Sequence, residues 1–487
     1  MVIENCKQEL RDAIGTEKVR DDNVCMTTYA MDAAPIFRKP DLVVLPESAE
    51  DVRKVLPIAN KYRLAVTVMA TGINVVGLTV PSEHGMVLDM RRMNKIIEIN
   101  TDSGYATIEP GVTFEQFTNA LRKVGFRCQV CTTHPSASVA ANYMMGPSGT
   151  FCTRHLDPMI DLEVVFPDGS ITNTGSAHFP GSGPHRRYGS GPDLTGLFAL
   201  GHGTMGIVTK SSVRIYPKTE GNALPMATFP SFEASIRFSQ DVVLNNIAEH
   251  IIVYSWRMWL DAYAKGSTTF KEPPKGMPYN AVTMRLAGYP GTVETNLKII
   301  EKVAQKYGGT LHSEEEAAKM MLYYRDFQQW YFDSKTLQIT PARLEQLSSA
   351  ARPGTETDEM GLYIAWVVNA TPKDVIECEK WAMQKIEDIG LGVPAYYSQP
   401  YDYGRSWFLR IFIYPDALDP AVMQKVAATF TGMFDEALAR YHATPYRARG
   451  FGAVPWLHGT GEFRNYVKKL KAAVDPNNIL NPMMLGQ

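Results

Sequence analysis

The stretch of sequence that decides the fold lies at residues 194–215 and reads LTGLFAL-GHGTMG-IVTKSSVRI. Its centre, residues 201–206, matches the G-x-G-x-x-G string of dinucleotide-binding proteins. That fingerprint needs a strand before the glycines and a helix after them, because the pyrophosphate binds at the N-terminus of that helix. Here the order is reversed, since residues 194–200 have a helical pattern and residues 207–215 are typical of a strand. The sequence therefore disfavours a Rossmann fold.

Composition and charge narrow the class of protein. The chain has 487 residues, with 49 Lys+Arg against 51 Asp+Glu and a formal net charge of −2. Such a balance disfavours a nucleic-acid partner, because phosphate neutralisation needs a concentration of Lys and Arg. The short basic cluster at residues 468–471, Lys-Lys-Leu-Lys, is interpreted as the solvated face of a helix.

The same composition bears on the cellular compartment. No stretch approaches the ~20 consecutive apolar residues of a membrane span. The N-terminus carries acidic residues where a signal peptide has basic and then apolar ones. Six scattered Cys are typical of a reducing compartment. We therefore expect a cytoplasmic protein with no membrane span.

The order of predicted elements indicates two kinds of domain. Up to residue 217, short β-type runs such as 42–45 and 65–69 alternate with helical patterns, one of which begins near Thr113. From about Pro217 onward the chain shows three long strand–helix pairs. The strands are expected at 281–286, 362–368 and 407–414, and the helices at 293–307, 372–389 and 420–441. This pattern predicts an α+β domain in which helices cover one antiparallel sheet.

A set of Cys and His residues has two interpretations. Cys128, Cys131 and His134, followed by Cys152 and His155, approach the spacing of a structural zinc site. The other interpretation is that the Cys side chains are small buried hydrophobes, which predicts no metal site. The chain has no P-loop, no Gly-x-Ser-x-Gly and no His-Glu-x-x-His, which disfavours nucleotide-hydrolase, serine-hydrolase and zinc-protease chemistry.

Several segments, in order along the chain, resemble the flavin-dependent oxidoreductase family typified by vanillyl-alcohol oxidase and 4-cresol dehydrogenase, which also includes glycolate oxidase subunits. These segments are 40–46, 87–96, 108–113, 162–169, 196–198 with 203–210, and 474–482. The resemblance implies a PCMH-type FAD-binding domain of two α/β subdomains at 1–217 and an α+β substrate-binding cap domain at 218–440. It also implies a C-terminal segment, 441–487, that returns to the FAD domain. The glycine-rich strings are then FAD loops, where small residues let backbone amides approach the diphosphate closely.

The resemblance implies three FAD-binding loops and a C-terminal contact. The expected cofactor-binding residues are Thr71, Gly72, Ile73, Asn74 and Val75; Pro135, Ser136, Ser138, Ala140, Ala141 and Asn142; Gly206, Ile207 and Val208; and Asn481. Non-covalent FAD is expected, because the first loop lacks the His that carries FAD in some members. Cys131 lies near the flavin-linked Cys of other members and is the alternative attachment point. Ala140-Ala141 replaces the Gly-Gly pair of many members and favours a dehydrogenase over an oxidase.

The resemblance also suggests how the substrate is held. Tyr446-Arg447 is similar to the Tyr-Arg pair that binds the phenolate in vanillyl-alcohol oxidase-like enzymes, which implies that both residues are catalytic. Both groups can stabilise an anionic oxygen, and a phenolate eases hydride departure from its para carbon. Tyr397, Arg405 and Arg449 are expected to bind the substrate.

The implied reaction is hydride transfer from an aromatic alcohol or para-alkylphenol-like substrate to flavin N5. The alternative is a 2-hydroxyacid dehydrogenase of the lactate or glycolate type, in which the same Arg holds a carboxylate. The expected partners are a small organic substrate and an electron acceptor, either a protein or oxygen, and the chain is compatible with a homo-oligomer. A flavin-free relative remains an alternative, because both phosphate loops depart from the family pattern.

Overall fold

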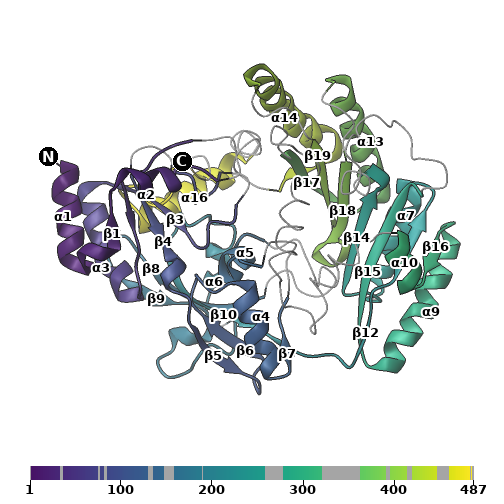
Figure 1. Cartoon of the computed structure of the whole chain (residues 1–487), viewed down its shortest axis with the longest axis horizontal. Helices are drawn as coiled ribbons and strands as arrows, with labels where there is room; N and C mark the ends of the chain where they lie inside the picture. Colours follow the sequence, from purple (N-terminus) through teal and green to yellow (C-terminus); the bar gives the residue numbers. More distant parts are fainter. Residues whose placement is uncertain are drawn as a thin grey trace. The chain divides into compact units, whose positions relative to one another are not determined.

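The structure is a computed structural model of the chain (Figure 1). It describes residues 2–32, 37–74, 77–81, 85–129, 135–146, 158–188, 190–257, 278–320, 362–390, 395–413, 419–446, 460–482 and 484. These residues form two compact units: the first contains those up to Lys218 and from Thr460 onward, and the second contains those from Thr219 to Tyr446. None of the helices in these ranges is long and apolar enough to cross a membrane.

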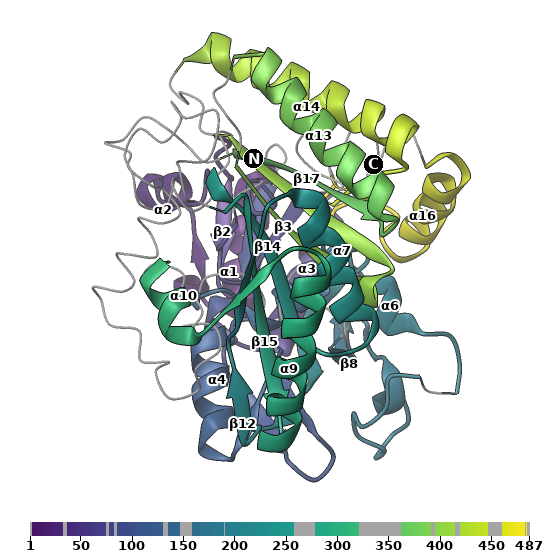
Figure 2. The same cartoon turned by 90° about the vertical axis from the view of Figure 1, so that its right-hand side faces the viewer.

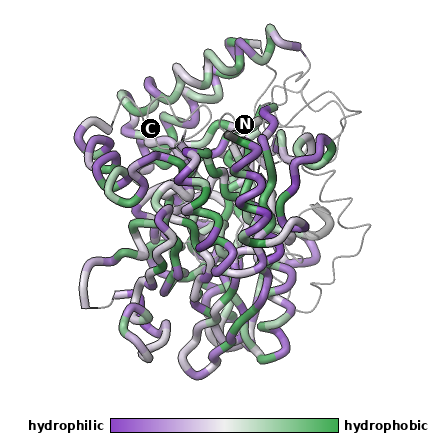
Figure 3. Tube along the Cα trace, turned by 90° about the vertical axis from the view of Figure 1, so that its left-hand side faces the viewer, coloured by the Kyte–Doolittle hydropathy of each residue, from purple (hydrophilic) through white to green (hydrophobic). Residues whose placement is uncertain are grey.

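The first unit begins with a four-stranded sheet of order β1-β2-β4-β3. Its elements are β1 (Val19–Arg20), β2 (Leu42–Val44), β3 (Ala65–Met69), β4 (Gly85–Asp89), α1 (Val2–Ile14), α2 (Asn23–Thr28) and α3 (Ala49–Tyr62). β2, β4 and β3 are parallel, and α3 connects β2 to β3. In Figure 3 the helical segments near the N-terminus alternate between hydrophilic and hydrophobic residues, as expected of helices with one buried face.

A five-stranded antiparallel sheet, of order β5-β6-β10-β8-β9, completes the framework of this unit. Its strands are β5 (Ile96–Asn100), β6 (Tyr105–Ile108), β8 (Met159–Val165), β9 (Ile171–Asn173) and β10 (Ile207–Arg214), with a separate pair β7 (Phe126–Arg127) and β11 (Tyr216–Pro217). The helices are α4 (Phe114–Lys123), α5 (Val139–Met144) and α6 (Leu194–Phe198). Because α6 precedes the glycine-rich string and β10 follows it, the predicted helix–glycine–strand order is confirmed.

The second unit is built on one antiparallel sheet of order β16-β13-β15-β14-β18-β19-β17-β20, with β12 paired to β15. Its strands are β12 (Gly221–Ala223), β13 (Met226–Phe229), β14 (His250–Ser255), β15 (Asn280–Gly288), β16 (Thr310–His312), β17 (Leu362–Asn369), β18 (Ala395–Tyr401), β19 (Ser406–Ile413) and β20 (Thr444–Pro445). Its helices are α7 (Phe232–Leu244), α9 (Pro290–Lys306), α10 (Glu314–Met320), α13 (Pro372–Asp388) and α14 (Pro420–Tyr441). The three predicted strand–helix pairs are confirmed as β15–α9, β17–α13 and β19–α14.

Helices α7, α9, α13 and α14 cover one face of this sheet, and they lie in front of it in Figure 2. On this side Trp366 of β17 packs against Trp381 of α13 and Phe434 of α14, with ring centroids 6.1 and 5.5 Å apart. Side chains alternate along a strand, so the neighbours of Trp366 in β17 point to the opposite face. The α+β class expected from the sequence is therefore confirmed.

Helix α16 (Gly461–Val474) and the residues after it belong to the first unit. Leu480 forms a parallel bridge with Val66 of β3, and the amide of Asn481 donates to the carbonyl of Val66 at 2.9 Å. The interpretation of residues 468–471 as a solvated helix face is wrong for Lys471, whose side chain is 4% exposed. Lys471 lies on the buried side of α16, whereas Lys468 and Lys469 lie on the exposed side of the same helix.

Candidate functional site

Two of the predicted cofactor loops lie against each other. The amide of Ser138 donates to the hydroxyl of Thr71 at 3.0 Å, across 67 residues of sequence. Ser138 precedes α5, where its hydroxyl accepts from the amide of Ala141 at 3.1 Å and donates to the carbonyl of Pro110 at 2.6 Å. The hydroxyls of Thr71 and Ser138 are therefore both hydrogen-bonded to backbone groups. The structure brings these loops together as the FAD interpretation requires.

The first loop, which follows β3, is held by short polar side chains. Gly72 has φ +78, a conformation that residues with a Cβ rarely adopt. The side chain of Asn74 accepts from the amide of Leu78 at 3.2 Å. Asp32, which the sequence motifs do not single out, accepts from the amide of Gly77 at 3.2 Å and the hydroxyl of Thr79 at 3.4 Å. No spacing rule connects Asp32 to this loop, so only the folded chain identifies it. Ile73 is 47% exposed, and Val75 lies outside the described residues.

The second loop combines buried and accessible small residues. Ala140 is buried in the core of the first unit, whereas the two residues that follow it in α5, Ala141 and Asn142, are partly exposed. The carbonyl of Pro135 accepts from the amide of Glu115 at 3.0 Å and so ties the loop to α4. Ser136 is partly exposed beside it.

The Cys and His set that suggested zinc is only partly described. Cys128 is buried, and burial raises the pKa of its thiol to about 12. Cys131, His134, Cys152 and His155 lie outside the described residues.

The glycine-rich string and the C-terminal segment meet at Gly203. A Cβ added to Gly203, which has φ +69, would lie 2.7 Å from Cγ1 of Val68 and 2.9 Å from Nδ2 of Asn481. Nδ2 of Asn481 donates to the carbonyl of His202 at 2.6 Å, while its buried Oδ1 accepts no hydrogen bond from any described residue. Farther along, Ile207 and Val208 are buried in β10, so that only their backbone can face a ligand. The close contacts at Gly203 leave no room for a side chain, and the buried Oδ1 of Asn481 can still accept a hydrogen bond. Both features fit a tightly bound cofactor such as FAD.

Lys471 joins the glycine-rich string to the end of the chain. Its ammonium donates to the carbonyls of Thr204 at 2.8 Å and Leu480 at 2.7 Å and to the carboxylate of Asp475 at 2.5 Å. Asp475 in turn accepts from the amides of Ile479 at 3.0 Å and Leu480 at 2.8 Å. Burial lowers the pKa of Lys471, and the contact with Asp475 opposes that shift. This buried ion pair fixes the position of the segment that carries Asn481.

In the second unit, the face of the sheet opposite the four helices is lined with aromatic rings. We call it the aromatic face and define it by Tyr254, Tyr363, Tyr397, Tyr401, Phe408 and Phe412. Tyr397 lies 6.2 Å from Phe408 between ring centroids, and Tyr446 lies 4.5 Å from Phe408 in an edge-to-face contact. The amide of Tyr446 donates to the carbonyl of Ala365 in β17 at 3.1 Å. The two predicted tyrosines, Tyr397 and Tyr446, therefore belong to one aromatic cluster.

The cation of this cluster is Arg410, which the sequence patterns do not single out. Its guanidinium carbon lies 4.5 Å from the ring centroid of Tyr363, 4.7 Å from that of Tyr397 and 4.8 Å from that of Phe408. The signal in the sequence is the two-residue period of Phe408, Arg410 and Phe412, which places all three on one face of a strand. Stacking on several rings orients the guanidinium plane.

Arg405 does not share this environment. It lies directly before β19, where its guanidinium pairs with Asp402 at 2.6 Å and its side chain is 70% exposed. In the sheet register, Tyr397 lies opposite Arg410 rather than Arg405. The expectation that Arg405 binds the substrate therefore has no support from its position. Arg447 and Arg449 lie outside the described residues.

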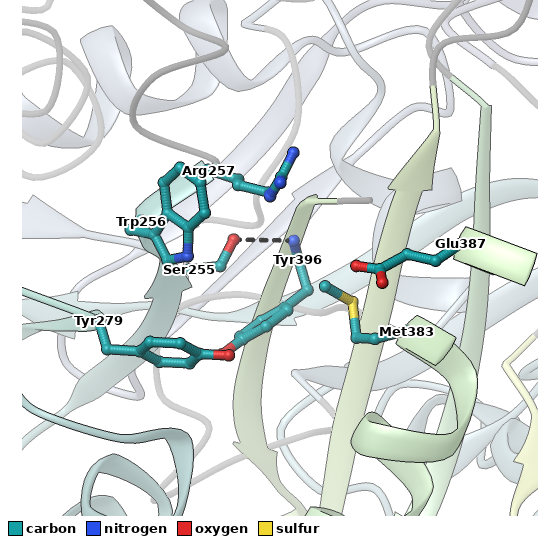
Figure 4. A pocket seen from close by; sticks show the side chains of 7 residues that line it. All are labelled: Ser255, Trp256, Arg257, Tyr279, Met383, Glu387 and Tyr396. Atoms are coloured by element: carbon teal, nitrogen blue, oxygen red, sulfur yellow. Dashed lines mark hydrogen bonds between the residues drawn. The ribbon is translucent and has the colours of Figure 1, made fainter. Parts of the chain in front are cut away.

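A separate pocket lies between α13 and the ends of β14, β15 and β18. Figure 4 shows Ser255, Trp256, Arg257, Tyr279, Met383, Glu387 and Tyr396 around it. The hydroxyl of Ser255 accepts from the amide of Tyr396 at 3.0 Å, and the guanidinium carbon of Arg257 lies 4.6 Å from the ring centroid of Trp256. This pocket contains none of the predicted site residues.

Glu379 of α13 is buried near Tyr396, and burial raises the pKa of its carboxyl to about 8 from an ordinary value of 4.5. Between these two pH values the folded protein holds a proton that the unfolded chain releases, so stability falls as pH rises from about 4.5 to 8. Glu379→Gln removes this dependence. The variant is expected to gain a few degrees in Tm relative to wild type at pH 8 but not at pH 4.5. Thermal denaturation at both pH values checks this.

The matched control is Glu377→Gln, because Glu377 lies on the same helix but is exposed. Its Tm difference from wild type is expected to be small and equal at both pH values. A Glu379→Gln variant with the same Tm difference at the two pH values would contradict the assignment.

Comparison with known proteins agrees with this geometry. A family model described as FAD binding domain matches residues 40–175. Glycolate oxidase subunit GlcD of Bacillus subtilis is 25% identical over 99% of this chain and 97% of its own length. The 4-cresol dehydrogenase [hydroxylating] flavoprotein subunit of Pseudomonas putida is 26% identical over 98% of this chain and 94% of its own.

The structural comparison addresses the fold alone. The chain matches 4-ethylphenol oxidase of Gulosibacter chungangensis, in an isoeugenol complex, with a TM-score of 0.87 and 20% identity over 100% of this chain and 97% of that one. The match extends over both units and confirms the predicted fold class, in which an α+β domain with an antiparallel sheet follows the N-terminal α/β subdomains. Together, these comparisons show that residues 40–175 match an FAD binding domain and that the whole chain is similar to FAD-dependent oxidoreductases with a PCMH-type FAD-binding domain.

Proposed function

We propose that this oxidoreductase removes a hydride from an aromatic alcohol or a para-alkylphenol-like compound. Arg447 and Tyr446 bind the anionic oxygen of the substrate, and Tyr397 forms part of the aromatic surface against which its ring packs. FAD, when bound, supplies the hydride acceptor at N5. Thr71, Ser138, Gly203 and Asn481 belong to the loops that would hold it.

The observation that carries this proposal is the aromatic face of the cap sheet. Tyr446 and Tyr397 both contact Phe408, and Arg410 stacks beside them. Rings arranged in this way suit an aromatic ligand, because edge-on and offset ring contacts add to the burial of apolar area. The 4-cresol dehydrogenase relative and the 4-ethylphenol oxidase neighbour, both named for para-alkylphenols, support the same substrate class.

The proposed chemistry follows from the charge of the anion-binding pair. A guanidinium stays protonated at any working pH and forms charge-assisted hydrogen bonds with a phenolate oxygen. The hydroxyl of Tyr446 supplies a second donor. By stabilising the phenolate, these groups keep electron density available at the para carbon and so favour departure of the hydride.

Oxidation of a 2-hydroxyacid is the second candidate. It is favoured by the glycolate oxidase relative, which this chain matches over nearly its whole length. Arg410 supports it chemically, because a guanidinium held by several rings can present two parallel donors to a carboxylate. The first candidate function requires binding of a phenolate and the second requires binding of a carboxylate. Tests with both kinds of substrate therefore distinguish them.

Absorbance spectroscopy of the purified protein tests the proposal. Flavin bands are expected, and after acid precipitation the yellow colour is expected in the supernatant, since the FAD is proposed to be non-covalent. Anaerobic addition of 4-methylphenol or 4-hydroxybenzyl alcohol is then expected to bleach the flavin, whereas D-lactate and glycolate leave it oxidised. Slow re-oxidation of the bleached protein by air is expected of a dehydrogenase.

Other outcomes have definite meanings. Bleaching only by D-lactate or glycolate would establish the second candidate. Colour that stays in the pellet would point to covalent attachment, with Cys131→Ala as the next variant to examine. A protein that stays colourless after addition of FAD would overturn both candidates.

A further inference from the structure

The aromatic face contains one buried polar side chain whose hydrogen-bonding groups are unused. Gln399 of β18 is 0% exposed, and neither its amide nitrogen nor its amide oxygen has a hydrogen-bond partner among the residues that the structure describes. A buried amide without partners is costly, because it loses its hydrogen bonds to water and gains none in return. Such a group is rarely retained in a core unless a ligand or a water molecule satisfies it.

Ser398, the neighbour of Gln399 in β18, is a polar residue whose hydrogen bonds are made within the fold. Ser398, on the helix-covered side, donates to the carbonyl of Phe408 at 2.9 Å and accepts a hydrogen bond from the indole of Trp407. The hydroxyl of Ser398 is therefore satisfied entirely by the sheet. Gln399 differs because its surroundings on the aromatic face are rings.

The position of Gln399 places it beside the proposed substrate-binding residues. Strand alternation puts it on the same face as Tyr397 and Tyr401. In the register of β18 with β19 it lies directly opposite Phe408, so their side chains are neighbours on that face. Phe408 is the residue whose ring contacts Tyr446, at 4.5 Å. Gln399 and Tyr446 are therefore both neighbours of the Phe408 side chain. Tyr446 is the residue proposed to bind the substrate oxygen.

We propose that Gln399 is a substrate-binding residue that recognises a second polar group on the aromatic substrate. The side-chain amide of Gln399 has a donor, its NH2 group, and an acceptor, its oxygen. It therefore fits a substrate group that can both donate and accept a hydrogen bond, which is a hydroxyl or a carboxamide. The substrate class is thus an aromatic alcohol or alkylphenol with an additional hydrogen-bonding substituent on the ring. This inference rests on the proposed function and narrows it.

The experiment compares 4-methylphenol with ring-substituted analogues that carry a second hydroxyl or a carboxamide. In wild type, kcat/KM for the best analogue is expected to exceed that for 4-methylphenol at least about 10-fold, because an unsubstituted ring leaves the buried amide without a partner. In Gln399→Met, which keeps the size of the side chain but removes both groups, this ratio is expected to fall to about one. Flavin reduction is followed by anaerobic stopped-flow absorbance.

Two controls keep the result interpretable. Gln384→Met changes an exposed glutamine of α13 that already bonds Asp388 at 2.8 Å, and it is expected to retain the wild-type ratio. The Tm of Gln399→Met is expected to equal or exceed that of wild type, because an unpartnered amide contributes no hydrogen bond to the fold. A lowered Tm with an unchanged substrate ratio would instead assign Gln399 a structural role and overturn the proposal.

The remaining outcomes distinguish this inference from the proposed function. If phenols bleach the flavin but every analogue has the same kcat/KM as 4-methylphenol, the role of Gln399 is wrong and the proposed function stands. If no phenol of either kind bleaches the flavin of the holoenzyme, the proposed function is wrong and the inference fails with it.

Discussion

Replacing Arg447 with alanine is expected to lower kcat/KM for the anionic substrate by roughly 30- to 700-fold, equivalent to a loss of about 2–4 kcal/mol. The physical reason is that the proposed contact is a charge-assisted hydrogen bond that keeps the substrate oxygen in its anionic form, from which the hydride departs. Steady-state kinetics with the substrate that bleaches the flavin measures the loss. A split into KM and kcat shows whether the contact acts on binding or mainly in the transition state.

The structure supplies a matched control for this variant. Arg405 is also an arginine of the second unit, but it is 70% exposed and paired with Asp402 in a turn. Arg405→Ala is expected to leave kcat/KM within about twofold of wild type, because exposed ion pairs contribute little. An Arg447→Ala variant that keeps wild-type kcat/KM for every anionic substrate tested would refute the anion-binding role. Equal losses in both variants would indicate a general effect of removing charge from this unit.

Lys471→Met is expected to have the largest effect on stability. The substitution leaves the carboxylate of Asp475 buried without its cation and removes the hydrogen bonds to the carbonyls of Thr204 and Leu480. Breaking a buried ion pair by removing one partner costs about 3–5 kcal/mol. For a unit of this size, that corresponds to a decrease in Tm of roughly 6–20 °C. Because the same ion pair positions Asn481, the variant is also expected to be purified with less FAD.

Thermal denaturation and the ratio of flavin to protein absorbance check both effects. Lys469→Met is the control, since Lys469 lies on the same helix but is exposed, and its Tm is expected to match that of wild type. Adding Asp475→Asn to Lys471→Met is expected to recover part of the lost Tm, because the uncompensated charge is removed. An unchanged Tm in Lys471→Met would mean that the buried pair does not hold the C-terminal segment.

Local patterns in the sequence predict much of the framework. Residues 281–286, 362–368 and 407–414 appear as strands and are followed by helices, because apolar side chains recur at periods of two and 3.6 where one face of an element is buried. The reversed order around residues 201–206 also follows from local pattern. β14 and β18 were not predicted from the sequence, although both are buried along nearly their whole length.

The candidate site divides in the same way. From the sequence by itself come the prediction of FAD loops at residues 71–75 and 135–142 and the Tyr-Arg pair at 446–447, since these strings are local and resemble a family. Only the tertiary structure decided that Ser138 bonds Thr71, that Arg410 rather than Arg405 stands among the rings, and that Lys471 is buried. Each of these depends on which residues of distant segments are brought within a few ångströms of one another. Such pairings are set by sheet register and by the burial of whole elements, and composition and spacing along the chain carry no record of them.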